Sequence, residues 1–170
     1  MEETLQPLDV EDPEIRRLML EGMRIAFAQT PLHELLGINL ETISKGSARA
    51  SMPVAPEAFN STGNLHGGAI ATLIDVACGS AAATAGTFIP GKNHLVTADL
   101  HIRYLGRPHG SSITADAQVI RAGRQLIVVE CRVTDEDQRL ISTADFAGMV
   151  VDVRLPLDVA TSSSNQQPDI

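Results

Sequence analysis

The segment Asn60–Gly86 constrains the fold of this chain more than any other stretch. It opens with turn-forming residues, passes through a His-Gly-Gly sequence and continues as a long run of small and apolar residues with one charge, Asp75. A carboxylate on a helix that is apolar on nearly all sides is costly unless it is paired or used in chemistry. The segment therefore predicts a buried helix over about 66–85 that presents Asp75 as an acid, a base or a nucleophile.

The composition fits one globular domain of 170 residues. Aromatic residues make up 3% of the chain and Trp is absent, so the core must be built from Ala, Val, Ile and Leu. A net charge of −8 argues against a general nucleic-acid surface, which needs a basic stripe. Cys78 and Cys131 lie in apolar segments without metal-ligand spacing, so we expect buried, reduced thiols and no metal site.

The N-terminus is acidic and lacks an early apolar run. The segment that comes closest to a membrane span, 68–85, carries Asp75 and several polar residues. We therefore expect neither a signal peptide nor a membrane span, and a cytoplasmic location.

A helix is predicted to start at Asp12-Pro13, because proline is favoured at the first helical position. One helix before Pro31 leaves no room for a helix-turn-helix that reads DNA. The spacing instead indicates an amphipathic helix that packs on the main domain through Ile15, Leu18, Leu20, Met23, Ile25 and Phe27.

Alternation of apolar and polar residues predicts strands on both sides of the central helix. A hairpin precedes the helix, with strands at 35–45 and 47–54, and an antiparallel meander follows it, with strands at 94–105, 111–120, 125–135 and 140–153. In the strand 94–105 the alternation assigns Val96, Ala98, Leu100, Ile102 and Tyr104 to one face, and Thr97, Asp99, His101 and Arg103 to the other. Gly86, Pro90 and Gly91 are expected to end the central helix.

This order of elements predicts an α+β fold, in which a curved antiparallel sheet wraps one buried helix. The exposed edges of such a sheet favour a dimer.

The central helix and its flanks resemble the hotdog-fold acyl-CoA thioesterases, in particular their phenylacetate-pathway (PaaI-like) branch. The matching residues are Asn60, His66-Gly67-Gly68, Asp75 nine residues after the histidine, and the strand 96–108 (VTADLHIRYLGRP). The likeness covers roughly 35–153. The acid of the helix is Asp in this branch and Glu in the related hydroxybenzoyl-type branch.

Composition predicts an N-terminal acidic segment and helix (1–30) and a disordered polar tail (156–170). Between them the resemblance implies a hotdog thioesterase domain (31–155). It also implies a homodimer whose two sheets join into one, often doubled to a tetramer. Acyl-CoA would be hydrolysed to a free acid and CoA at the dimer interface without a cofactor. Asp75 would come from the partner of the subunit that supplies Asn60 and Gly67.

The residues have chemically plausible roles in such a site. An ionised Asp75 attacks the thioester carbonyl or deprotonates a water that does so. The Gly67 N–H, at a helix N-terminus, stabilises the oxyanion. Asn60 orients the carbonyl or the water, His66 positions the loop, and the Thr97 hydroxyl holds water or Asp75.

Substrate binding is expected to involve Gly68, which lets the thioester approach closely, and two arginines of the 121–124 hairpin. Arg121 and Arg124 would hold the CoA phosphates, with Lys92 and Arg107 as alternatives.

Two other functions remain open at this stage. One is an acyl-thioester hydratase or dehydratase on the same fold with His66 as the base. The other is a non-catalytic acyl-CoA-binding protein, which has no use for a buried acid.

Overall fold

The structure is a computed structural model that describes residues 9–85, 89 and 92–152. Residues 1–8 of the acidic N-terminal segment, the tail 156–170 and the residues expected to end the central helix, Gly86, Pro90 and Gly91, lie outside the described residues.

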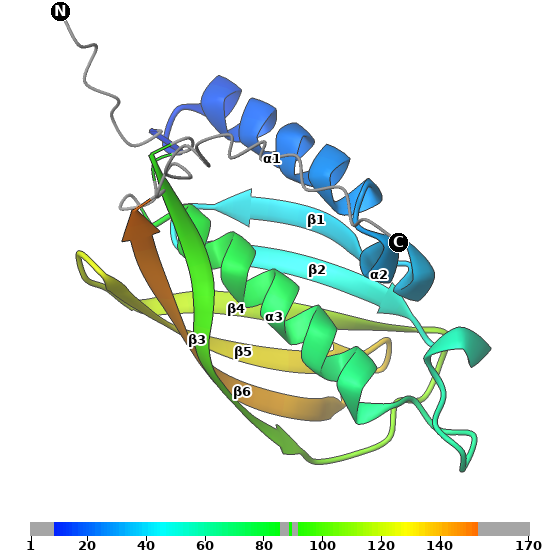
Figure 1. The fold of residues 1–170 in the computed structure, drawn as a ribbon. Helices are drawn as coiled ribbons and strands as arrows, with labels where there is room; N and C mark the ends of the chain where they lie inside the picture. The colour runs from blue at the N-terminus through cyan, green and yellow to red at the C-terminus, as the bar shows by residue number, and fades with distance from the viewer. Residues whose placement is uncertain (1–8, 86–88, 90–91, 153–170) are drawn as a thin grey trace, which may run out of the picture.

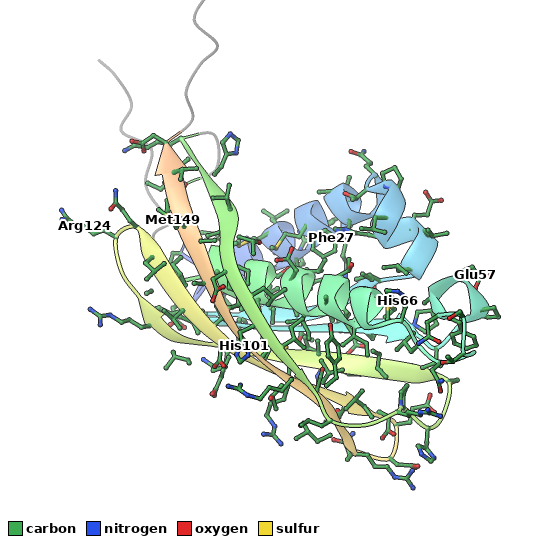
Figure 2. The ribbon with its side chains drawn as sticks, turned by 60° about the horizontal axis from the view of Figure 1, so that its bottom comes forward. Phe27, Glu57, His66, His101, Arg124 and Met149 are labelled. Atoms are coloured by element: carbon green, nitrogen blue, oxygen red, sulfur yellow. The ribbon has the colours of Figure 1, made fainter. Side chains whose placement is uncertain are left out.

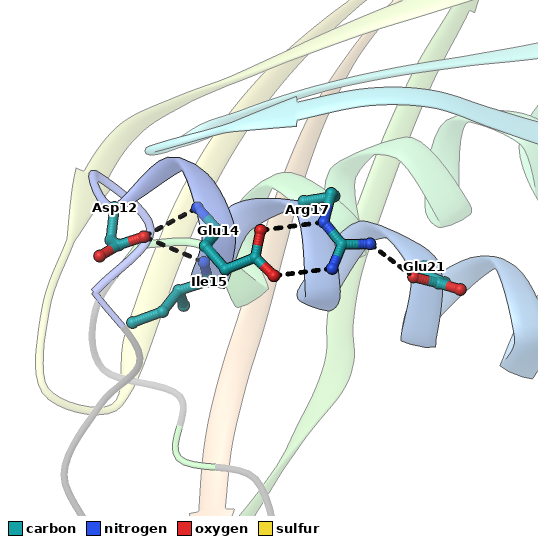
Figure 3. A network of polar contacts seen from close by, with 5 residues as sticks. All are labelled: Asp12, Glu14, Ile15, Arg17 and Glu21. Carbon is teal, nitrogen blue, oxygen red and sulfur yellow. Dashed lines mark hydrogen bonds and ion pairs between the residues drawn. The ribbon is translucent and has the colours of Figure 1, made fainter.

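The predicted N-terminal helix is confirmed as α1, Pro13–Ala28. Asp12 caps it, because its carboxylate accepts hydrogen bonds from the N–H groups of the first turn. On the outer side of the helix, Arg17 lies between Glu14 and Glu21 and pairs with both (Figure 3). These exposed pairs support the helix locally.

The inward face of α1 differs from the prediction. Leu18 and Ile25 are 54% and 55% exposed instead of facing the domain. Positions four residues apart lie above one another on a helix, so one stripe turns inward and Leu18 and Ile25 fall outside it. The partly buried side chains that pack against the core are Met19, Leu20, Met23 and Phe27.

A second helix, α2 (Pro31–Leu36), was not predicted, and the strand expected from residue 35 was placed too early. Proline starts α2, and Gly37 ends it in the left-handed conformation with φ of 64°. The strand β1 therefore begins only at Asn39 and runs to Ser44.

The predicted hairpin is confirmed, with β1 paired to β2, Ser47–Pro53. A bulge between Leu40 and Thr42 shifts the alternation, so Leu40 and Ile43 are both buried although they are three residues apart. The inward face of β2 is the predicted one: Ala48, Ala50 and Met52.

Four longer strands complete one antiparallel sheet in the order β1-β2-β4-β5-β6-β3. Their bounds are Asn93–Tyr104 for β3, Ser112–Ala122 for β4, Leu126–Asp135 for β5 and Leu140–Asp152 for β6. The predicted four-strand meander is therefore wrong in one respect, because β3 pairs with β6 and not with β4. The segment 106–110, between β3 and β4, therefore connects the edge of the sheet to its middle.

The central helix is confirmed as α3, Gly67–Ala83, after a short 3₁₀ turn at Pro56–Ala58. It crosses the concave side of the curved sheet, while α1 lies beside β1 (Figure 1). Leu73, Ile74, Ala77 and Cys78 are fully buried against the sheet. Both cysteines are buried and unbridged, as predicted. The arrangement is that of the predicted hotdog fold.

Strand β3 does not keep the predicted alternation of faces. Its pairing with β6 shifts between Thr97 and Asp99, which leaves Ala98 as a bulge. Before the bulge, Leu95 and Thr97 face α3, whereas Val96 is 43% exposed. After it, Leu100 and Ile102 pack against the core. The bulge thus turns Thr97 toward the central helix.

Candidate active site

Asp75 and Thr97 meet where α3 passes β3. The Thr97 hydroxyl donates a 2.7 Å hydrogen bond to Oδ1 of Asp75. Asp75 is half-buried, and its Oδ2 has no hydrogen-bond partner among the described residues. The expected contact between these two side chains is therefore present, and it leaves one carboxylate oxygen free to react.

A cavity of about 420 Å³ opens beside Asp75, between α1, α3 and β3. This volume is within the range of small-molecule sites. The polar groups on its wall are Asp75, Thr97, Ser80, His33 and His94, and the remaining lining residues are Met23, Phe27, Val76, Gly79, Ala83, Leu95 and Phe146.

His33, on α2, is a cavity residue that sequence reasoning missed. Its ring meets that of Phe27 edge-on, with centroids 5.0 Å apart, and its Nδ1 is buried without a hydrogen-bond partner. Burial lowers the pKa of His33, and the negative charge of Asp75 opposes this shift. No sequence signal marked His33, because the short helix that carries it was not predicted.

The loop before α3 is built around Asn60. Its Oδ1 accepts hydrogen bonds from the Thr62 N–H (2.9 Å), the Thr62 hydroxyl (2.7 Å) and the Asn64 N–H (3.2 Å). The side chain thus closes a turn in the manner of an Asx turn. Its amide NH2 group donates no hydrogen bond among the described residues, and this is the group left to meet a ligand.

His66 caps α3, since its Nδ1 accepts a 2.8 Å hydrogen bond from the Gly68 N–H. Figure 2 shows His66 at the start of the helix. Because its Nδ1 accepts this hydrogen bond, that nitrogen carries no proton. The cap uses the Gly68 N–H. The Gly67 N–H, at the first helical position, takes part in no hydrogen bond of the described residues and has no partner within a helix.

Tyr104 joins the end of β3 to this loop, and sequence reasoning did not assign it to the site. Its hydroxyl donates a 2.9 Å hydrogen bond to the Gly67 carbonyl. Burial raises the pKa of Tyr104. Tyr104 therefore holds the Gly67–Gly68 peptide, which is next to the peptide that carries the free Gly67 N–H.

Asp75 and Gly67 do not meet within one chain. They are eight residues apart on α3, which is about 12 Å along a helix that rises 1.5 Å per residue. A thioester carbonyl is far shorter than this separation. One copy of the chain therefore holds two halves of the expected site, one at Asp75 with Thr97 and the other at Gly67 with Asn60.

The two arginines expected to bind phosphates lie at the β4–β5 hairpin, and Figure 2 shows Arg124 far from His66. A cavity of about 770 Å³ adjoins them, lined also by Gly123, Gln125, Leu126 and Val128. Neither Arg121 nor Arg124 takes part in an ion pair between described residues. Both charges are thus available to an anion.

Across residues 9–85, 89 and 92–152, no three His, Cys, Asp or Glu side chains gather so that they could hold a metal ion. Within the same residues, no helix has the length and apolar character needed to cross a membrane.

Comparison with known proteins shows which family and which relatives this chain is similar to. Residues 62–142 match the family described as Thioesterase superfamily. The chain is 30% identical over 132 residues to the medium/long-chain acyl-CoA thioesterase YigI of Salmonella typhimurium, over 71% of this chain and 85% of that protein.

Two solved structures share the fold. A mutant of the Pseudomonas aeruginosa thioesterase PA1618 superposes with a TM-score of 0.72 at 27% identity, over 79% of this chain and 94% of that chain. The Escherichia coli PaaI protein from the phenylacetic acid degradation operon superposes with a TM-score of 0.70 at 20% identity, over 80% of this chain and 95% of that chain.

Proposed function

Because the chain belongs to the thioesterase superfamily, we propose that it hydrolyses acyl-CoA at a site shared by two copies, with Asp75 from one and Gly67 from the other. The observation that carries this proposal is the separation of a free carboxylate oxygen from a free N–H along one helix. Each of the two groups can take part in thioester hydrolysis, but within a single copy they lie too far apart to act on the same substrate carbonyl.

The edge strand β3 supports an arrangement that joins the two halves. It is a 12-residue strand that pairs on one side only, with β6, among the described residues. Thr97, the fifth residue of the strand, contacts Asp75, while Tyr104, its last residue, contacts Gly67. Antiparallel pairing of two β3 edges, centred between these positions, would bring Asp75 of one copy toward Gly67 of the other.

The chemistry follows from the groups at hand. The free oxygen of Asp75 attacks the thioester carbonyl carbon, or it deprotonates a water that attacks it. The Gly67 N–H and the positive end of α3 stabilise the oxyanion that forms. The carbon–sulfur bond then breaks, and with one water consumed the products are a carboxylic acid and the CoA thiol. The amide group of Asn60 orients the carbonyl or the water.

CoA would extend from this site toward positive charge. We assign its phosphates to Arg121 and Arg124, which have no carboxylate partner among the described residues. The acid on α3 is Asp, which favours the PaaI-like branch of the superfamily. The proposal includes a dimer or a dimer of dimers and a cytoplasmic location.

A thiol-release assay over short, medium, long and aryl acyl-CoAs tests the function. The wild-type protein should release thiol from at least one class, and Asp75→Asn should lower kcat/KM by at least about a hundredfold. His66→Asn, which keeps a side chain that can cap the helix, should retain most activity. Equal turnover by wild type and Asp75→Asn would overturn the role of Asp75. A hydratase releases no thiol, so the absence of thiol release from every class by wild type would favour that alternative. Loss of thiol release confined to the His66 variant would make His66, and not Asp75, the base of the hydrolysis.

A further inference from the structure

Helix α1 packs on the domain through partly buried side chains only. None of its residues is fully buried. It is held from one side by Arg24, whose guanidinium donates to the backbone carbonyls of Leu40 (2.7 Å) and Glu41 (2.8 Å) on β1. The cavity beside Asp75 lies under this helix, and Met23 and Phe27 of α1 line it.

The opposite wall of this cavity is a row along α3. Asp75, Gly79 and Ala83 all line it and are four residues apart, so they lie above one another on one face of the helix. From the carboxylate to Ala83 the row covers about 12 Å. A Cβ placed on Gly79 would meet no atom within 4 Å, so the middle of the row is open space.

The remaining walls give the cavity its chemical character. Its sides are formed by Met23, Phe27, Leu95 and Phe146. Besides Asp75 and Thr97 its polar groups are His33, His94 and Ser80, and the Ser80 hydroxyl donates to the Val76 carbonyl of its own helix. A mostly apolar pocket that begins at a reactive carboxylate and continues away from it suits a hydrocarbon group attached to the reacting carbonyl.

We infer that the space between α1 and α3 receives the acyl chain, and that Gly79 determines how long a chain is accepted. This inference rests on the proposed acyl-CoA hydrolysis. An extended chain advances about 1.25 Å for each C–C bond of about 1.5 Å, so the row accommodates about eight to ten carbons. The substrate class is therefore a medium-length acyl group, and a short acyl group leaves most of the pocket empty.

Side chains of increasing size at Gly79 provide the test. Gly79→Ala, Gly79→Val and Gly79→Leu should shorten the preferred acyl chain progressively. The ratio of kcat/KM for decanoyl-CoA to that for butyryl-CoA should fall about tenfold or more in Gly79→Leu. Gly79→Ala should fold at least as well as wild type, because alanine is the better helix former.

Gly22→Leu is the matched control. Gly22 also lies within a helix and a Cβ there would meet no atom within 4 Å, but it is exposed and does not line the cavity. Its ratio of decanoyl to butyryl activity should stay at the wild-type value. An unchanged ratio across the whole Gly79 series, in folded and active variants, would overturn the inference.

Binding of non-hydrolysable thioethers separates this inference from the proposed function. S-decyl-CoA should bind more tightly than S-butyl-CoA to the wild-type protein, and Gly79→Leu should lose that preference. If no acyl-CoA is hydrolysed but this binding pattern holds, the proposed catalysis fails and the pocket assignment stands. If hydrolysis occurs but both thioethers bind equally to wild type, the pocket assignment fails alone.

Discussion

The Thr97 hydroxyl donates a 2.7 Å hydrogen bond to Oδ1 of Asp75, and this contact connects the edge strand β3 to the central helix α3. It exists because the bulge at Ala98 turns Thr97 inward. The bond holds one carboxylate oxygen in place. The other has no hydrogen-bond partner among the described residues, and the side chain lines the cavity.

Removing this hydroxyl should weaken catalysis without abolishing it. A hydrogen bond to a charged group is worth about 1.5–3 kcal/mol, so Thr97→Val should lower kcat/KM by about tenfold to a hundredfold. Thr97→Ser keeps the donor and should stay within about threefold of wild type. Steady-state kinetics on one acyl-CoA measures both variants, and equal losses in the two would indicate a packing role for Thr97.

Gly67 offers a substitution that removes a single N–H. Proline is favoured at the first position of a helix, and the extended backbone of His66 (φ −69°, ψ 134°) is compatible with a following proline. Gly67→Pro should therefore fold but lose about a hundredfold to a thousandfold in kcat, as expected for an oxyanion donor.

Gly67→Ala is the control for Gly67→Pro. It keeps the N–H and adds a Cβ, which would lie 3.3 Å from the Tyr104 ring in this backbone. Thus Gly67→Ala measures the steric cost alone. Similar activity of the proline and alanine variants would contradict the assignment of the Gly67 N–H.

Thr84 ties the end of α3 to the β1–β2 turn. Its buried hydroxyl accepts a hydrogen bond from the Gly46 N–H (2.8 Å) and lies 2.8 Å from the Ser44 carbonyl, to which it can donate. Thr84→Val would leave the Gly46 N–H unpaired, which should cost about 1–3 kcal/mol in the free energy of unfolding. Denaturant unfolding measures this cost, and Thr84→Ser should recover most of it.

His33 should make the protein sensitive to acid. Because burial lowers its pKa in the folded state, the unfolded chain binds a proton that the folded chain does not. Stability therefore falls as the pH drops below the unfolded value of about 6.5 and through the lowered folded pKa. His33→Phe should flatten the loss of Tm between pH 7 and pH 5, measured by thermal unfolding.

An exposed histidine provides the comparison for His33. His109→Gln should leave the pH dependence of Tm as in wild type, since that side chain is exposed. The carboxylate of Asp75 and the imidazole of His94 line the same cavity as His33. Both are present in every variant, so they do not account for a difference between the variants. An unchanged pH dependence in His33→Phe would rule out His33 as the cause.

Much of the fold was readable from the sequence, because apolar composition and alternation report burial directly. The helix α3, the β1–β2 hairpin and the wrapping of one helix by a curved sheet are confirmed. What local patterns could not reveal was the placement of β3 beside β6, since strand pairing depends on contacts distant in sequence. The bulge at Ala98 is of the same kind, because it appears only in the register with β6.

For the candidate site, the sequence identifies candidate residues where they belong to a motif and not elsewhere. Residues with a motif, such as Asp75 and Gly67, could be named in advance, and the structure adds which N–H and which oxygen are free. His33 and Tyr104 have no motif. His33 reaches the site because the chain turns between α1 and α2, which sets its ring against that of Phe27. Tyr104 reaches it because β3 ends beside the start of α3.

The shared site is the central claim, and mixed dimers test it most directly. Asp75→Asn and Gly67→Pro should each be nearly inactive alone. Co-expressed with different affinity tags and purified as the mixed species, they should regain thiol release approaching half that of wild type per dimer, because one of the two sites then has both intact groups. Mixed species as inactive as the parent variants, at a mass that confirms the dimer, would contradict a site built from two copies.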